Sequence, residues 1–401
     1  MKKLAFLLLT LIVAFSVIGC TGKNTETSGG SKEAGAGGSA QGSSEPIKIG
    51  GVFAASGSSA SLGKPEMDTL NMMAEKINAE GGVNGRKIEV IAYDDKSDQN
   101  EAVIAIKKLI EQDKVVAVIG GTTSGSSLAM IPQAEKAKIP FISVAASKNI
   151  NKPVKKYVFK TAQGDDVVIP RIIDYLKKQN IKKVAWLSVD NPFGSSGKEE
   201  FDVLAKEAGI EIAISEVFEA TVNDAKPMLT RVKQTNPETI IVWGTAQESA
   251  IVTKNIRELG IQAPVVESHG IGNKKFIELA KDAANGVVFP AGRLLVADQI
   301  PADSKQKPVL EAYAKMFKEK YNTEPSTFGG HAYDAFEILM AVIKSTGDDK
   351  EKIRAALETS TKEFTGVTGV FTMSEQEHNG LQADSLAMIE IKDGKWMLKE
   401  N

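Results

Sequence analysis

Short apolar runs alternate along this chain with segments whose apolar residues recur every three or four positions. An apolar run at 48–55 precedes a segment, 65–82, in which Met67, Leu70 and Ala74 lie at helical spacing. This pattern predicts a buried strand followed by an amphipathic helix. The same order continues, with strands expected at 87–95, 115–120 and 139–147 and helices at 100–113 and 127–138. Strands and helices in this order predict a parallel sheet with helices on both faces.

The pattern then begins again and continues to about residue 291. Strands are expected at 157–162, 183–190, 211–220, 239–245, 264–270 and 286–291, and helices near 166–178, 195–208, 224–236, 247–259 and 274–281. Two such units in tandem predict an α/β protein with two doubly wound parallel-sheet lobes and a cleft between them. Ligands of open parallel sheets bind at the carboxyl ends of the strands. The loops after those strands are therefore the expected site.

Three of these loops consist of small and hydroxyl-bearing residues. They read "SGSSASLG" at 56–63, "GGTTSGSS" at 120–127 and "AASKN" at 145–149. Free backbone N–H groups and hydroxyls at the start of a helix bind anions. The loops match neither a dinucleotide-binding nor a P-loop pattern. They are interpreted as an anion site, and the alternative is that they are only helix caps and tight turns.

The first 45 residues predict export and anchoring. Residues 4–18 are almost wholly apolar, follow two lysines and end in "VIGC", which places the one cysteine of the chain at Cys20. The apolar run has the length of a signal-peptide core, and "VIGC" resembles a bacterial lipobox. The prediction is a signal peptide over 1–19, a lipid attached to Cys20 and a flexible tether over 20–45. The alternatives are an ordinary signal peptide or a lone buried cysteine.

Composition and charge exclude several classes of protein. Hydrophobic residues make up 42% and charged residues 25% of 401 residues, and the formal net charge is −2, which gives no bulk attraction to nucleic acid. The single cysteine excludes an internal disulfide. No G-x-S-x-G motif and no His-x-x-x-His pair occurs, and the three histidines are scattered. We therefore expect no enzyme, no metal and no cofactor, and His331 and His378 are interpreted as structural.

Longer motifs carry a resemblance to a known family. The runs "GGVNGRKIE", "YDDKSD", "NPFG", "HAYDA" and "FTGVTGVFTM" resemble the branched-chain amino acid binding proteins of bacterial ABC importers. The resemblance implies the type I periplasmic-binding-protein fold, a monomer, and delivery of ligand to a membrane permease from outside the cytoplasmic membrane. It also implies three crossovers, near 163–166, 290–294 and 373–378. The first lobe would comprise 46–164 plus 293–375, and the second 165–292 plus 376–401.

The same resemblance assigns site residues. It implies that the Ser124 and Ser147 hydroxyls, the Ala145 backbone and Ala146 hold the ligand carboxylate and ammonium. A family aromatic of the second lobe corresponds to Phe193. Several donors are needed because a buried carboxylate is otherwise costly.

Two positions depart from the family pattern. His269 stands where a carboxylate would meet the ligand ammonium, and Ala246 stands where a tyrosine is expected. A charged histidine would repel an ammonium. Glu267 or Glu248 could supply the missing anion if the register differs by a residue or two.

Two ligand classes therefore stay open. One is a branched-chain or other hydrophobic amino acid. The other is a small carboxylate without an amine, such as an aromatic acid, for which Trp243, Phe193 or Phe53 would offer apolar contact. A receptor that passes a ligand signal to a partner is the remaining alternative.

Overall fold

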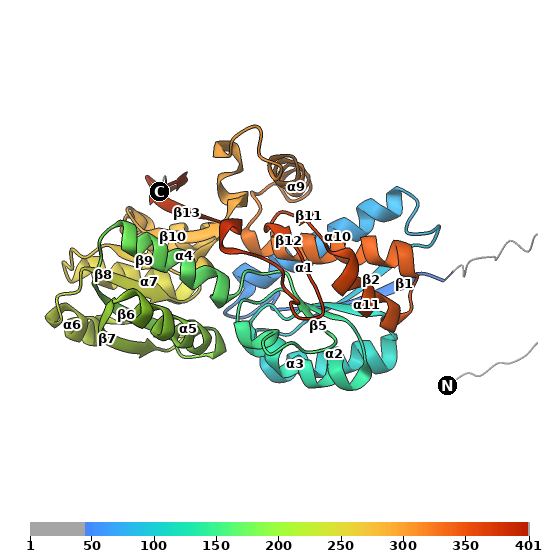
Figure 1. The fold of residues 1–401 in the computed structure, drawn as a ribbon, viewed down its shortest axis with the longest axis horizontal. Coiled ribbons are helices and arrows are strands. Elements are labelled where there is room, and N and C mark those ends of the chain that lie inside the picture. Colours follow the sequence, from blue (N-terminus) through green and yellow to red (C-terminus); the bar gives the residue numbers. More distant parts are fainter. Residues whose placement is uncertain (1–44, 400–401) are drawn as a thin grey trace, which may run out of the picture. The chain divides into compact units, whose positions relative to one another are not determined.

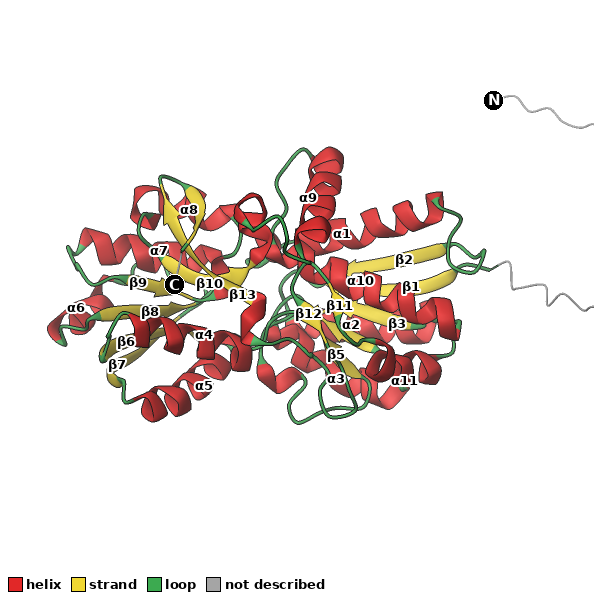
Figure 2. Ribbon diagram, turned by 45° about the horizontal axis from the view of Figure 1, so that its top comes forward, coloured by secondary structure: helices red, strands yellow, loops and turns green. Residues whose placement is uncertain are grey.

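The computed structural model describes residues 45–399. The predictions for the signal peptide, Cys20 and nearly all of the tether fall outside these residues. Two sheets, each flanked by helices, make up two lobes of the described part (Figures 1 and 2). Among the described residues, no helix is both long and apolar enough to cross a membrane.

The first sheet is parallel throughout and has the strand order β2-β1-β3-β4-β5. Its strands are β1 (Ile47–Phe53), β2 (Ile88–Asp94), β3 (Ala117–Gly120), β4 (Phe141–Ser143) and β5 (Val158–Lys160). The run expected at 157–162 therefore completes this first sheet rather than opening the second. Strands β1 and β3 to β5 are almost wholly buried, which explains their continuous apolar runs.

The second sheet is mixed, with the order β14-β13-β10-β9-β8-β6-β7. Its strands are β6 (Lys183–Val189), β7 (Glu211–Phe218), β8 (Thr239–Trp243), β9 (Val265–Glu267), β10 (Val288–Gly292), β13 (Leu386–Lys392) and β14 (Lys395–Leu398). The parallel arrangement predicted for β6 to β10 is confirmed. Strands β13 and β14, which run antiparallel at one edge, were not predicted from the sequence.

The helices are α1 (Ala60–Ala79), α2 (Gln99–Lys108), α3 (Ser124–Ala137), α4 (Asp165–Lys178), α5 (Pro192–Ala208), α6 (Lys226–Gln234), α7 (Ala246–Glu258), α8 (Lys274–Ala280), α9 (Lys307–Tyr321), α10 (Thr327–Thr346) and α11 (Lys350–Ser360). Helices α1 to α8 lie close to the predicted segments, whereas α9, α10 and α11 were not predicted from the sequence. Helix α1 begins within the serine-rich loop expected at 56–63, so that loop is shorter than predicted. Helix α10 packs along α1 and covers the first lobe (Figure 1).

The chain passes between the two sheets three times, after β5, after β10 and after the hairpin of β11 (Phe364–Thr365) and β12 (Val370–Phe371). The residue bounds of the two lobes stay a prediction. Asn379 donates to the carbonyls of Lys160 and Ala162 at 3.0 Å each, beside β5. These bonds hold Asn379 beside the first sheet.

Candidate ligand cavity

A cavity of about 210 Å³ lies where the carboxyl ends of strands from both sheets meet. The first lobe contributes small and hydroxyl-bearing residues, and the second contributes an aromatic ring, an imidazole and a carboxyl group. The principal lining residues are Ser58, Ser59, Leu62, Thr122, Thr123, Ser124, Gly125, Val144, Ala145 and Ala146 on one side and Asn191, Pro192, Phe193, Thr245, Glu248, His269 and Gly270 on the other. Phe328 and His331 of α10 also line it.

The first-lobe wall is organised by the turn from β3 into α3. Gly120 and Gly121 have φ values of +141° and +68°, and a Cβ at Gly120 would lie 2.1 Å from the Val52 carbonyl oxygen. Only glycine fits there. The Thr123 hydroxyl then accepts from the Ser126 N–H at 3.0 Å and caps the helix. The Ser127 N–H donates to the Thr123 carbonyl, so the N–H groups left for an anion in this turn are those of Ser124 and Gly125, which both line the cavity.

A second loop completes this wall. The Ser124 hydroxyl oxygen accepts a hydrogen bond from the Ser147 N–H at 3.2 Å, which ties the loop after β4 to the start of α3. Beneath that loop the fully buried Lys160 ammonium donates to the Ala146 carbonyl at 2.9 Å. Burial lowers the pKa of Lys160. When charged, this ammonium favours an anion above the loop.

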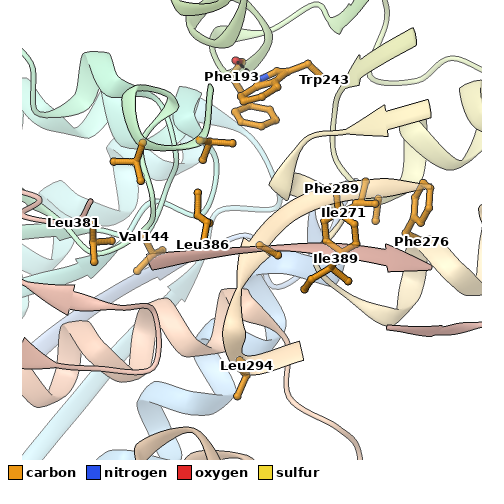
Figure 3. Close-up of a cluster of buried hydrophobic side chains, with 14 of the residues drawn as sticks. Val144, Phe193, Trp243, Ile271, Phe276, Phe289, Leu294, Leu381, Leu386 and Ile389 are labelled. Atoms are coloured by element: carbon orange, nitrogen blue, oxygen red, sulfur yellow. Dashed lines mark hydrogen bonds between the residues drawn. The ribbon is translucent and has the colours of Figure 1, made fainter. Parts of the chain in front are cut away.

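The second-lobe wall rests on stacked aromatic side chains. The Asn191 side chain accepts from the Phe193 N–H at 2.9 Å and caps α5. The Phe193 ring stacks on Trp243 with centroids 5.2 Å apart, and the indole N–H donates to the Phe193 carbonyl at 3.1 Å (Figure 3). Trp243 is fully buried and does not line the cavity. It holds Phe193 in place from behind.

His269 lies beside this stack, in the short helical turn His269–Ile271 after β9. Its ring meets Phe193 edge-on at 5.6 Å and Trp243 at 5.7 Å. Within residues 45–399 neither ring nitrogen has a hydrogen-bond partner, and Nδ1 is fully buried. Burial lowers the pKa of His269 to about 3, so the imidazole is neutral near pH 7. A neutral imidazole accepts a hydrogen bond, so the expected repulsion of an ammonium does not arise.

The two alternative carboxylates differ in position. Glu248 lines the cavity, but Oε1 accepts from the Thr245 N–H at 2.6 Å and from its hydroxyl at 2.9 Å, in a capping box. Burial raises the pKa of Glu248. Glu267 does not line the cavity, since it accepts from the Thr253 hydroxyl at 2.7 Å within the second lobe. The described part of the chain offers the cavity no carboxylate whose oxygens are free of such contacts.

The structure brings five of the residues expected at the site together. They are Ser124, Ala145, Ala146, Phe193 and His269. It does not bring Ser147 and Ala246 to the cavity, although both were expected there. The Ser147 hydroxyl instead accepts from the Asn149 N–H at 3.2 Å, and Ala246 is fully buried in the first turn of α7. The Phe53 side chain, offered for an aromatic ligand, lies in the first-lobe core.

His331 was interpreted from the sequence as structural, but it lies at the cavity. The residue lines the cavity from the second turn of α10. No strand end precedes it, so the rule that places ligands at strand ends does not reach it. The sequence feature that could have indicated its position is the pair Gly329 and Gly330 just before it, because glycines let a helix approach its neighbours closely. Among the described residues, no group of three or more His, Cys, Asp or Glu side chains could hold a metal ion.

Comparison with known proteins defines the class. The family model described as periplasmic binding protein matches residues 46–395, so the chain belongs to that family. The chain is 26% identical over 322 residues to the leucine-, isoleucine-, valine-, threonine- and alanine-binding protein of Pseudomonas aeruginosa, covering 80% of this chain and 84% of that one. These relatives are binding proteins, which confirms the expectation that the chain is not an enzyme.

Solved structures agree on the fold. An extracellular ligand-binding receptor from Rhodopseudomonas palustris matches with a TM-score of 0.83 and 26% identity, over 88% of this chain and 99% of that one. The branched-chain amino acid transporter substrate-binding protein LivJ of Streptococcus pneumoniae, solved with isoleucine, matches with a TM-score of 0.77 and 30% identity, over 88% and 97%. The predicted type I periplasmic-binding-protein fold and the predicted family are confirmed.

Proposed function

We propose that this protein is the substrate-binding component of an ABC importer and that it captures a branched-chain or other hydrophobic amino acid in the cavity. One observation carries the proposal. A donor-rich wall of small residues faces an apolar wall across a single cavity of about 210 Å³, in a chain whose relatives are named for leucine, isoleucine and valine. Family membership supports the binding role, and the cavity chemistry supports the ligand class.

Each part of such a ligand finds a matching group. The carboxylate would take N–H groups of the first turn of α3 and the Ser124 hydroxyl, above the Lys160 ammonium. The hydrocarbon side chain would lie against Phe193, with Leu62 and Val144 opposite. The ammonium would donate to a neutral imidazole, because His269 has no other partner among the described residues.

Capture would proceed by hinged closure. First-lobe groups bind the carboxylate, and Phe193 and His269 then bridge to the same ligand from the second lobe, so their contacts favour the closed state. An ion pair between Lys148 of the first lobe and Glu200 of α5, at 2.6 Å, joins the lobes beside the cavity. The mechanism needs no covalent step.

The location of the protein belongs to the same proposal. A lipid on Cys20 and a tether over 20–45 would hold the binding lobes outside the cytoplasmic membrane, beside a permease. The family to which the chain belongs supports a location outside the cytoplasm. We propose that the protein acts as a monomer.

A second ligand class is favoured by one specific observation. His269 occupies the position at which a free carboxylate would accept hydrogen bonds from a ligand ammonium. Both carboxylate oxygens of Glu248 already contact Thr245. A small carboxylic acid without an amine would need no such carboxylate. Its carboxylate would still use the first-lobe wall.

A thermal-shift screen of the purified protein tests both classes. Ligand bound to the folded state raises the melting temperature by mass action. A rise with leucine, isoleucine or valine supports the first class, and a rise only with amine-free acids such as benzoate or 4-methylpentanoate replaces it with the second. No rise with either set contradicts the proposed function.

A further inference from the structure

His331 differs from an ordinary buried histidine in what its ring touches. The side chain is 3% exposed and lines the cavity from α10. Its Nδ1 lies 3.0 Å from the Thr368 hydroxyl oxygen, and within residues 45–399 its Nε2 has no hydrogen-bond partner. Burial lowers the pKa of His331 to about 3, so the ring is neutral near pH 7. One polar ring atom is thus left for the ligand.

The neighbours of Thr368 indicate which tautomer this ring adopts. The buried Asp334 carboxyl group accepts from the Thr368 N–H at 2.6 Å, which places it close enough to take a hydrogen bond from the Thr368 hydroxyl as well. A hydroxyl has one proton, and when it goes to the carboxylate the oxygen is left to accept from His331 Nδ1–H. Nε2 then carries a lone pair and accepts. Its natural partner is an N–H or O–H group of the ligand.

Thr368 belongs to a buried turn, Gly366–Gly369. All three crossovers, the passages of the chain between the two sheets, are connected to this turn. Asp334 of α10 accepts from the Val367 and Thr368 N–H groups at 2.7 and 2.6 Å. Gln163, in the first passage, donates to the Thr368 carbonyl at 3.1 Å. The turn itself joins β11 to β12, just before the third passage.

The second passage reaches the same turn through a glutamine. Gln306 donates to the carbonyls of Gly366 and Val367 at 3.1 and 2.8 Å, and it accepts from Arg293, the residue after β10, at 3.1 Å. The backbone of His331 is tied in as well, because the Thr161 hydroxyl donates to its carbonyl at 2.9 Å. His331 therefore lies between the cavity and the segments that move when the lobes close.

We propose that His331 is a ligand contact and that its Nε2 accepts a hydrogen bond from the ligand ammonium. Through the bond from its Nδ1 to Thr368, the position of the turn Gly366–Gly369 then depends on whether a ligand is bound. The inference rests on the proposed function, since it assumes an amino-acid ligand in this cavity. It adds a second imidazole, from the opposite lobe, to His269 as an acceptor for the ligand ammonium. It also makes His331 a positioning residue for the hinge.

Two substitutions separate the two ring nitrogens. His331→Asn keeps an amide near Nδ1 and removes the Nε2 acceptor, so we expect leucine affinity to fall about tenfold to a hundredfold, the effect of losing a charge-assisted hydrogen bond. His331→Gln keeps an amide near Nε2 and removes the bond to Thr368, so we expect a smaller loss of affinity. Isothermal titration of the full-length protein with leucine and with amine-free 4-methylpentanoate measures both.

His378 provides the matched control. It is fully buried, stacks on Phe159 with centroids 4.2 Å apart, and hydrogen-bonds the Val158 carbonyl at 2.8 Å, away from the cavity. His378→Asn is expected to lower the melting temperature and to leave leucine affinity within twofold. A purely structural His331 would behave in the same way.

The outcomes distinguish this inference from the proposed function. Loss of the preference for leucine over 4-methylpentanoate in His331→Asn, but not in His378→Asn, supports the inference. Unchanged leucine affinity in His331→Asn overturns it while the proposed function stands. If the wild type binds 4-methylpentanoate as tightly as leucine, the ammonium contact is wrong. If it binds neither, the proposed function fails and this inference fails with it.

Discussion

The first-lobe wall of the cavity offers backbone N–H groups and hydroxyls on small residues, whereas the second-lobe wall offers an aromatic ring and an imidazole supported by a buried tryptophan. The first wall gains its chemistry from the positions of main-chain atoms at strand ends. The second gains it from side chains whose orientation depends on the packing behind them. Substitutions in the first wall should therefore reduce mainly ligand affinity, whereas substitutions in the second wall should reduce ligand affinity and stability together.

The largest expected effect comes from the second wall. Phe193→Ala removes a ring that is 7% exposed and packed on Trp243, so we expect a loss of about 3–5 kcal/mol in the free energy of unfolding together with loss of ligand binding. Denaturant unfolding and titration calorimetry measure the two losses.

Phe201→Ala is the control for this change. Phe201 is on the same helix, is fully buried and stacks on Trp186 with centroids 4.5 Å apart, away from the cavity. It should destabilise comparably and leave affinity nearly unchanged. Equal losses of affinity in both variants would mean that Phe193 acts only through stability.

The first wall should show the opposite behaviour. Ser124→Ala removes the proposed donor to the ligand carboxylate, and we expect ligand affinity to fall by about 1.5–3 kcal/mol. The Ser147 N–H also loses its acceptor, so we expect stability to fall by about 1 kcal/mol, less than in Phe193→Ala. Ser147→Ala deletes a neighbouring hydroxyl that only caps the turn Lys148–Ile150, so affinity should stay nearly constant. Calorimetric titration of the two variants measures their ligand affinities. A larger loss of affinity in Ser147→Ala than in Ser124→Ala would support the role in ligand binding that the family resemblance implied for Ser147.

The pH dependence of the free energy of unfolding tests the environment of His269 in the second wall. Burial lowers the pKa of His269 to about 3, so the unfolded chain binds a proton there between about pH 6.5 and 3 that the folded chain does not. Stability contributed by the neutral ring is therefore lost as the pH falls through this window, by about 2 kcal/mol between pH 7 and pH 5.

Buried carboxyl groups oppose this trend, and Asp165 and Asp334 are two of them. Burial raises the pKa of Asp165 to about 6 and that of Asp334 to about 7, so their contribution falls as the pH rises. Comparing the wild type with His269→Asn at both pH values cancels the carboxyl terms. The variant should lose less stability on acidification, and identical losses would show that His269 takes up its proton in the folded state as readily as in the unfolded one.

The smallest effect is expected at the partly buried ion pair that joins the two lobes. The Lys148 and Glu200 side chains are 22% and 18% exposed, so their ion pair should contribute less than about 1 kcal/mol to closure. Lys148→Met should weaken ligand binding only a fewfold, and added salt should reduce the difference from the wild type. A tenfold loss that persists in high salt would mean that the pair controls closure.

The difference between the walls also explains what the sequence could predict. The loops at 120–127 and 145–149 were recognised because glycines and hydroxyls after buried strands reveal main-chain sites directly. The sequence did not predict which side chains in these loops reach the cavity. Ser147 and Ala246 each lie one turn or less from it, but their orientation is set by local capping. His331 was missed because a helix from a distant part of the sequence brings it to the site.

One distance measurement tests the central claim, that both walls close on one amino acid. Spin labels at Lys136→Cys of α3 and Lys206→Cys of α5, in a Cys20→Ser background because Cys20 is the only cysteine, report the separation of the lobes. With leucine, isoleucine or valine the account predicts that the distribution shifts to shorter distances and narrows. An unchanged distribution at saturating ligand would contradict it.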